Sequence, residues 1–188
     1  MNNVIETILA RRSTRGFSET PLTQAETDLL TQVALASPTA RNTQSWHFSF
    51  VTNQALLNRF NLDMNAYMAA KFPAGQRGRF EENGYHVFYH APLVVVISTP
   101  SDDSANKFAQ IDCGIAVENL AIAAQSLGLR SVIVGLPRDL FNAPQSEGYR
   151  RDFGLPEGHE FAIAICIGHN TVTKEAHPIA DGKIDFIS

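Results

Sequence analysis

Apolar residues near the start of the chain recur with the spacing of amphipathic helices. Residues 4–10 place them three and four positions apart, which predicts a short first helix. Thr23 is followed three residues later by Glu26, and this pair matches a capping box at the start of a second helix over residues 24–36. Ser37-Pro38 ends that helix, because the residue before a proline is pushed into an extended conformation.

Four segments carry the apolar patterns of strands. Residues 46–51 alternate well enough to form a strand with one face on the core. Residues 91–97 form a continuous run rich in β-branched side chains, which predicts a central strand buried on both faces. Pro92 is tolerable only at the start of that strand. Residues 131–134 and 161–167 are two more runs of the buried kind.

The pattern is weakest between the first two predicted strands. Asn53 is placed to cap a short helix that ends near Phe60. Residues 61–84 mix aromatic and methionine side chains with glycine and arginine. We expect short helices and loops there rather than a strand.

The longest predicted helix, residues 106–127, is apolar around nearly its whole circumference. A helix of this kind must be buried on all sides. In a chain of 188 residues this predicts a central helix that is shared with a second copy of the protein. Gly128 supplies a left-handed stop at its end. The apolar positions are Phe108, Ile111, Ile115, Ala116, Val117, Leu120, Ala121, Ile122, Ala124 and Leu127.

Composition adds to this picture. A length of 188 residues fits one domain over residues 1–188 with a sizeable core. Charged residues make up only 18%, which predicts that some surface is buried against another subunit. The net charge of −4 argues against a general partner of nucleic acid or of a membrane surface. The last twenty residues are polar up to the apolar residues 184–187, and they could reach across to a second subunit.

Targeting and redox signals are few. The N-terminus has no charged region followed by an apolar core, so we predict no signal peptide. The longest apolar runs are too short to span a bilayer. Cys113 and Cys166 lie in apolar segments without CxxC spacing, which predicts buried, reduced thiols and a cytoplasmic location.

Candidate chemistry begins with an arginine cluster. Arg11-Arg12-Ser13-Thr14-Arg15 places three guanidinium groups and two hydroxyls within five consecutive residues. Arginine offers a planar fork of donors that fits phosphate. The cluster therefore indicates a phosphate or oxyanion site, and the alternative is a solvated basic patch near the N-terminus.

A second polar cluster covers residues 37–46, between a predicted helix and a predicted strand. Its amide and hydroxyl groups suit recognition of the edge of a flat polar heterocycle. The alternative is a connection whose side chains satisfy backbone groups.

Other signatures of catalysis are missing from the sequence. It contains neither GxSxG, GxGxxG nor a P-loop, and no Ser/His/Asp set stands out. His86 and His90 have a spacing that can bring two imidazoles together on a helix, but no third ligand has a convincing spacing, and we expect no metal site.

Taken together, these motifs resemble the FMN-dependent nitroreductase family. The resemblance spans roughly residues 3–170 in the right order. The matching pieces are Arg11 to Arg15 with Phe17, Ser37-Pro38-Thr39 with Asn42, Gln44 and Trp46, Ala91-Pro92 before a valine-rich strand, Asp112 to Ala116 with Glu118-Asn119-Leu120, Ala124 and Gly128-Leu129, and Ile167-Gly168-His169.

The resemblance implies an α+β nitroreductase-like fold with a mainly antiparallel central sheet flanked by helices. It also implies an intertwined homodimer with FMN at the subunit interface. Arg11, Arg12, Ser13 and Arg15 would hold the phosphate and the polar edge of the flavin. Pro38, Thr39, Asn42 and Gln44 would come from the other subunit or line the same pocket. Gly135 and Leu136 would pass beside the isoalloxazine ring, and Lys174 would complete the phosphate site, with His177 and Lys183 as alternatives.

The implied activity is NAD(P)H-dependent oxidoreduction. A hydride would pass through flavin N5 to a nitroaromatic, quinone or related acceptor in alternating steps, so no catalytic acid, base or nucleophile is required of the protein. Alternatives are reductive dehalogenation, flavin-ring chemistry, or a flavin-binding sensor or storage protein without turnover. Residues 64–89 would form the substrate wall, where Phe72, Phe80, Tyr85 and Phe88 could stack on an acceptor or pack in the core.

Overall fold

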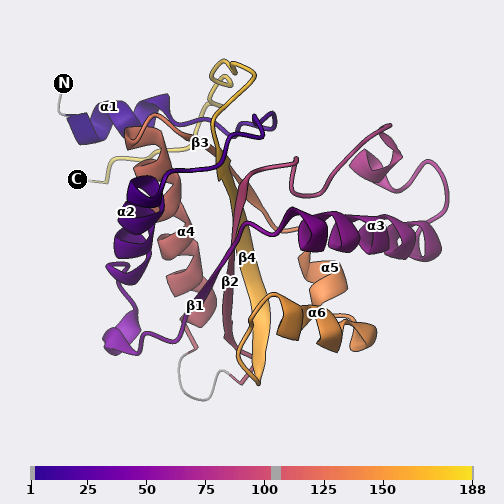
Figure 1. The fold of residues 1–188 in the computed structure, drawn as a ribbon. Helices are drawn as coiled ribbons and strands as arrows, with labels where there is room; N and C mark the ends of the chain where they lie inside the picture. The colour runs from indigo at the N-terminus through magenta and orange to yellow at the C-terminus, as the bar shows by residue number, and fades with distance from the viewer. Residues whose placement is uncertain (1–2, 103–106, 188) are drawn as a thin grey trace.

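All strand pairs of the central sheet are antiparallel, and the strand order is β1-β2-β4-β3. The structure is a computed structural model that describes residues 3–102 and 107–187 (Figure 1). The strands are β1 (His47–Val51), β2 (Leu93–Pro100), β3 (Arg130–Val134) and β4 (His159–Gly168). The α-helices are α1 (Asn3–Ala10), α2 (Gln24–Leu35), α3 (Gln54–Lys71), α4 (Ala109–Ser126), α5 (Arg138–Phe141) and α6 (Glu147–Asp152). Short 3₁₀ turns cover Ala40–Asn42, Gly78–Glu81 and Pro144–Ser146.

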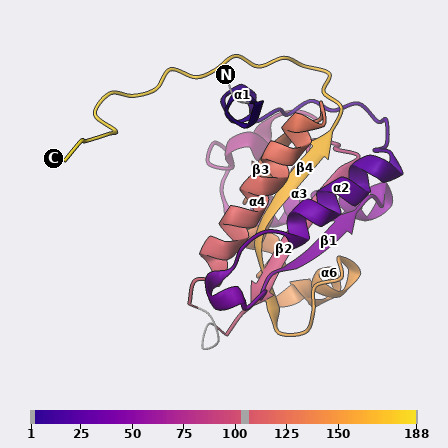
Figure 2. The same ribbon diagram turned by 90° about the vertical axis from the view of Figure 1, so that its left-hand side faces the viewer.

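Helices cover both faces of the sheet (Figures 1 and 2). Leu93, Val95 and Ile97 of β2 pack against α2 and α4. The alternate residues Val94 and Val96 pack on the opposite face with α3, α5 and α6. All five side chains are at most 1% exposed, which confirms a central strand that is buried on both faces.

The predicted strands and the first two helices are confirmed, with boundary shifts of at most three residues. The capping box of α2 is present: the Thr23 hydroxyl accepts from the Glu26 N–H at 3.2 Å, and the Thr23 N–H donates to the Glu26 carboxylate at 2.7 Å. This second bond lowers the pKa of Glu26. Gly128 has the left-handed φ of 78° expected after α4. Helices α5 and α6 were not predicted.

The prediction of a short helix ending near Phe60 was wrong. Helix α3 continues to Lys71, because Met64 and Met68 extend the buried stripe that begins with Leu57 and Phe60. Between Phe60 and Met64, Leu62 and Asp63 are exposed, whereas the polar Asn61 is buried. This mixture masked the helical period in the sequence. Helix α3 is therefore as long as α4, with 18 residues each.

Helix α4 departs from its prediction in two ways. It begins at Ala109, and the predicted start at residue 106 lies outside the described residues. Within one chain it is not buried on all sides: Ile111 is 61% exposed and Ile115 is 40% exposed, while Ala116 and Leu120 are fully buried against the sheet. None of the helices in the described ranges is long and apolar enough to cross a membrane.

The arginine-rich segment is fixed between two parts of the chain. Its Thr14 N–H donates to the Ser131 carbonyl of β3 at 2.9 Å. On the other side, the Ser18 N–H donates to the His169 carbonyl at 2.8 Å, and the Thr171 N–H donates to the Gly16 carbonyl at 3.0 Å. These bonds set the backbone from which the arginine side chains project.

Gly168, at the end of β4, allows the close approach beside this segment. A Cβ at Gly168 would lie 2.7 and 2.8 Å from ring atoms of Pro92 and 3.2 Å from the ring of Phe17. A proline ring cannot rotate away, so the backbones would have to separate.

We expect Gly168→Ala to lower the free energy of unfolding by about 1–3 kcal/mol, because overpacking a rigid contact forces the backbone to shift. Gly148→Ala in α6 is the matched control, since a Cβ there meets no atom within 4 Å. The control should leave stability unchanged or raise it by up to about 1 kcal/mol. Urea unfolding of the two variants measures the difference, and equal stabilities would contradict the close contact.

Candidate functional site

The arginines of the N-terminal cluster are engaged differently. Arg11 forms an ion pair with Glu118 of α4 through its Nε, at 3.2 Å, which leaves its two terminal amino groups available. Arg12 turns back on its own helix, and its Nη1 donates to the carbonyl oxygens of Leu9 and Arg11, both at 2.7 Å. Arg12 thus satisfies carbonyls at the C-terminal end of α1.

Arg15 lines a cavity of about 220 Å³ together with Gly135 and Leu136. The structure therefore brings together residues that are 120 positions apart in the sequence and that the sequence assigned to one site. The remaining lining is Arg79, Tyr85, Val87, Tyr89, Val132, Ile133 and Val134. No carboxylate, imidazole, thiol or aliphatic hydroxyl belongs to this lining. The cavity can bind a planar anionic group, but its described side chains include no nucleophile and no ordinary general base.

Part of the cavity wall is built from arginine and tyrosine, namely Arg79, Tyr85 and Tyr89. The Arg79 guanidinium lies over Tyr85 at 5.1 Å and over Tyr89 at 5.2 Å, measured to the ring centroids. It also donates to the Tyr89 hydroxyl at 2.9 Å and to both carboxylate oxygens of Glu82. Burial raises the pKa of Tyr85, so this hydroxyl stays protonated.

Sequence reasoning missed Arg79 and Tyr89 in this wall. The signal available in the sequence was the composition of residues 77–89, which contain two arginines and two tyrosines but no apolar period. Tyr85, one of the aromatic residues expected in the substrate wall or the core, lines this cavity. Phe88 is fully buried in the core instead, and Phe80 packs edge-on against Tyr85 at 5.0 Å.

The polar loop 37–44 is fastened to α4 at a different place. The Ala40 N–H donates to the Asp112 carboxylate at 3.1 Å, and the Asn119 amide donates to the Ser37 hydroxyl at 3.1 Å. Within the loop, the Gln44 N–H donates to the Thr39 hydroxyl at 2.9 Å, and the Gln44 amide donates to the Asn42 oxygen at 3.0 Å. In a single chain Pro38, Thr39, Asn42 and Gln44 do not line the Arg15 cavity.

Left-handed backbone at residues other than glycine is confined to two stretches of the described chain. Arg41, Asn42 and Gln44 have φ values of 48–56° in the polar loop. Tyr89, which lines the Arg15 cavity, and the following His90 have φ values of 54° and 53°. Backbone of this kind is costly and persists only where the surroundings impose it. Both stretches coincide with segments that the sequence associates with binding.

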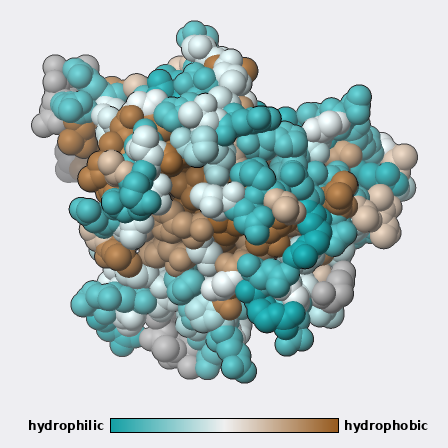
Figure 3. Space-filling model, in the orientation of Figure 1, coloured by the Kyte–Doolittle hydropathy of each residue, from teal (hydrophilic) through white to brown (hydrophobic). Residues whose placement is uncertain are grey.

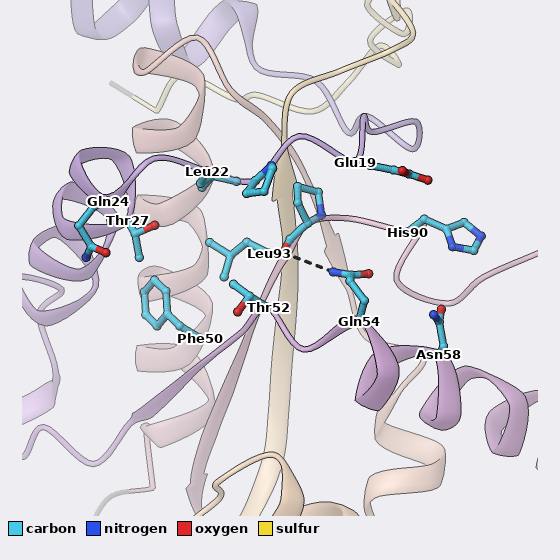
Figure 4. Close-up of a pocket in the computed structure, with 12 residues that line it drawn as sticks. Glu19, Leu22, Gln24, Thr27, Phe50, Thr52, Gln54, Asn58, His90 and Leu93 are labelled. Atoms are coloured by element: carbon cyan, nitrogen blue, oxygen red, sulfur yellow. Dashed lines mark hydrogen bonds between the residues drawn. The ribbon is translucent and has the colours of Figure 1, made fainter.

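A larger cavity of about 940 Å³ opens between α2, the end of β1 and the start of α3 (Figure 4). Leu22, Phe50 and Leu93 form its apolar part, and Glu19 and His90 stand at its side. Gln54 lies between Leu93 and His90 in this view (Figure 4), and its amide donates to the carbonyls of Ala91 and Pro92 at 3.1 and 3.5 Å. The lining of this cavity shares no residue with that of the Arg15 cavity.

The histidine pair has a structural role. His86 and His90 lie in turns rather than on a helix, with ring centroids 4.3 Å apart. His86 accepts from the Phe88 N–H at Nδ1, and its Nε2 faces the Asn58 oxygen at 3.2 Å. Burial lowers the pKa of His86 to about 4, so the ring is neutral at pH 7. Across residues 3–102 and 107–187, no group of three or more His, Cys, Asp or Glu side chains is placed to hold a metal ion.

The chain after β4 runs away from the body as an extended segment (Figure 2). Lys174 is half-buried three residues after the contact of Thr171 with Gly16, and His177 and Lys183 are exposed further along. Ile184, Phe186 and Ile187 are 75–97% exposed. Apolar surface also gathers over α1, α2 and α4 (Figure 3). Its most exposed large side chains there are Val4, Ile5, Ile8, Leu9, Leu29, Leu35, Ile111 and Ile115.

Known proteins resemble the chain over nearly its whole length. NADPH-flavin oxidoreductase of Vibrio harveyi is 29% identical over 182 residues, which are 95% of this chain and 70% of that protein. Two crystal structures of nitroreductases with bound FMN superpose on the full chain and are covered completely by it. The protein from Bacteroides fragilis has a TM-score of 0.90 at 26% identity, and the protein from Desulfitobacterium hafniense has 0.91 at 28%.

The family match agrees with the motifs and with the fold. The Nitroreductase family model matches residues 8–169, which include the arginine cluster, the polar loop and all four strands. The antiparallel sheet flanked by helices is the α+β arrangement that the resemblance implied. The chain therefore belongs to the nitroreductase family of oxidoreductases.

Proposed function

We propose that this protein is an FMN-dependent NAD(P)H oxidoreductase that works in alternating steps in one pocket. Bound FMN would supply the redox chemistry, hydride uptake from NADPH or NADH and two-electron reduction of a nitroaromatic, quinone or related acceptor, and the protein would hold and orient it. The observation that carries the proposal is the Arg15 cavity, where a cation, two tyrosine rings and the Gly135-Leu136 backbone converge. Buried cysteines fit a cytoplasmic location for this activity.

The arginine-rich segment fits a phosphate-bearing flavin. Arg11 is oriented by Glu118 through Nε, so its two terminal amino groups can donate to a phosphate. Arg15 stands at the cavity, where a cation stabilises negative charge on the polar edge of the reduced flavin. Ser13 is held beside Ser131 of β3 and offers a further donor. Arg12 would have to release the carbonyls of α1 before its Nη1 could reach a phosphate.

The remaining binding groups belong, in this proposal, to a second subunit. A cavity of about 220 Å³ is smaller than the range of about 300–1,000 Å³ that is usual for ligand pockets. Pro38, Thr39, Asn42 and Gln44 of the partner would close it, and Lys174 would complete the phosphate site. The exposed apolar residues of α1, α4 and the C-terminal segment supply the surface for an intertwined homodimer.

We expect the purified protein to carry a flavin whose visible absorbance bleaches rapidly on addition of NADPH or NADH. Nitrofurazone or a quinone should then restore the absorbance, because the same pocket serves both half-reactions. Stopped-flow spectroscopy measures each half-reaction separately. A bound flavin that neither nicotinamide reduces would exclude the oxidoreductase and favour a sensor or storage role. Reduction without reoxidation by either acceptor would favour the other flavin chemistries.

Replacing Arg11 and Arg15 together by alanine should weaken FMN binding by about 100-fold or more. Each arginine contributes charge-assisted hydrogen bonds, which are worth about 1.5–3 kcal/mol. The matched control is Arg59→Ala with Arg151→Ala, because these arginines lie on α3 and α6, outside the lining of the cavity. Fluorescence titration with FMN measures both. Unchanged affinity in the folded Arg11/Arg15 variant would overturn the phosphate assignment.

Ile111→Asp should convert a dimer into a monomer and reduce FMN binding with it, because a charge would be placed in the proposed interface. Leu62→Asp is the control: Leu62 is 68% exposed on α3, which packs on the opposite face of the sheet from α4. Sedimentation velocity at micromolar concentration gives the oligomeric state. A wild-type monomer with bound FMN would contradict the shared site.

A further inference from the structure

Tyr89 lies between two arginines in the wall of the cavity. The Cζ of Arg79 is 5.2 Å from its ring centroid, and the Cζ of Arg15 is 6.0 Å from the same centroid. Both guanidinium groups are therefore within the range of attraction to the π-face of this tyrosine. All three side chains line the cavity that faces Gly135 and Leu136.

The two arginines differ in how firmly they are held. Arg79 donates to the Tyr89 hydroxyl at 2.9 Å and to Glu82 from Nε and Nη2 at 3.1 and 3.2 Å. Arg15 makes no hydrogen bond or ion pair with any residue in the described part of the chain, and its ring contact is with Tyr89. Tyr89 is thus the group that restrains the Arg15 guanidinium at the cavity.

The backbone of Tyr89 makes it a rigid support. Its φ of 54° is left-handed, as is the φ of 53° at His90. The Tyr89 N–H donates to the His86 carbonyl at 2.8 Å, and the preceding Val87 and Phe88 are fully buried. A bulky residue adopts this conformation only where its surroundings impose it. The core therefore fixes the position of the ring.

We propose that Tyr89 is a positioning residue that holds Arg15 against the bound cofactor, an inference that rests on the proposed function. The ring attracts the guanidinium on the cavity side and prevents it from turning into solvent. Through Arg15, Tyr89 raises FMN affinity and stabilises the reduced form of the cofactor. Tyr89 itself transfers no proton and no electron. Arg79, fixed by Glu82, holds the hydroxyl end of the ring.

A double-mutant cycle tests this role. Asn tolerates left-handed backbone, so Tyr89→Asn removes the ring without adding strain. We expect it to weaken FMN binding by about 5-fold and to lower the midpoint potential of bound FMN, in the same direction as Arg15→Ala. In the Arg15→Ala background the same substitution should change neither quantity, because the side chain it acts through is gone. Tyr89→Phe keeps the ring and should stay close to wild type.

Tyr67→Asn is the matched control. Tyr67 also lies beneath a cation, with Lys71 Nζ 5.3 Å from its centroid, but it is on α3 and outside the cavity lining. The Tyr67→Asn substitution should leave the FMN affinity and the midpoint potential of bound FMN unchanged. Equal effects of Tyr89→Asn in both backgrounds would overturn the positioning role and leave Tyr89 a packing residue. If Arg15→Ala itself changes nothing, the assignment of Arg15 to the cofactor fails, and this inference fails with it. If the wild type binds no FMN, the proposed function fails as well.

Discussion

The pairing of β4 with β2 on one side and with β3 on the other is the constraint on which the rest of the molecule depends. Buried backbone N–H and C=O groups must find partners, so a strand enclosed by helices on both faces is fixed in register by its neighbours. Because Gly168 ends β4 against Pro92 and Phe17, the same register sets the path of the chain that follows. Residues 13–18 are then hydrogen-bonded to β3 on one side and to residues 169–171 on the other. The arginine cluster is thus positioned by the sheet, although it belongs to no strand of it.

This arrangement explains how the cavity can rely on few charged contacts. Arg11 is oriented by one carboxylate, and Arg15 by a tyrosine ring whose backbone is anchored in the core. An arginine that is oriented by one carboxylate or one aromatic ring keeps N–H donors available for a ligand. An arginine whose N–H groups are all hydrogen-bonded within the protein has none available. Arg79 and Arg12 are the contrast. Glu82 already occupies donors of Arg79, and the carbonyls of Leu9 and Arg11 occupy Nη1 of Arg12. The four arginines therefore have different interaction partners, which their spacing in the sequence does not reveal.

The sequence predicted the strands closely because a continuous β-branched run such as residues 93–97 is typical of a strand that is buried on both faces of a sheet. Helix α3 was predicted too short because its buried stripe uses two methionines and Asn61, residues with weak apolar signals. The arginine cluster could be linked to the polar loop only by resemblance to a family. The link from Arg15 to Tyr89 could not be predicted at all, because it depends on a left-handed turn formed by tertiary packing. Local pattern thus identifies elements, and long-range contacts decide what their side chains do.

In the proposed dimer, one chain alone contains only part of the binding site. The Arg15 cavity is small, and the polar loop is bonded to α4 without lining that cavity. The apolar residues Ile184, Phe186 and Ile187 of the last segment are 75–97% exposed in the single chain. In a monomer the exposed isoleucine and phenylalanine side chains would be unfavourable, because apolar surface in contact with water raises the free energy of the folded chain. A second copy related by two-fold symmetry would cover α4 with itself and bring a loop 37–44 to each cavity. The same burial of apolar surface would then both assemble the dimer and complete the site, so that cofactor affinity and subunit association are coupled.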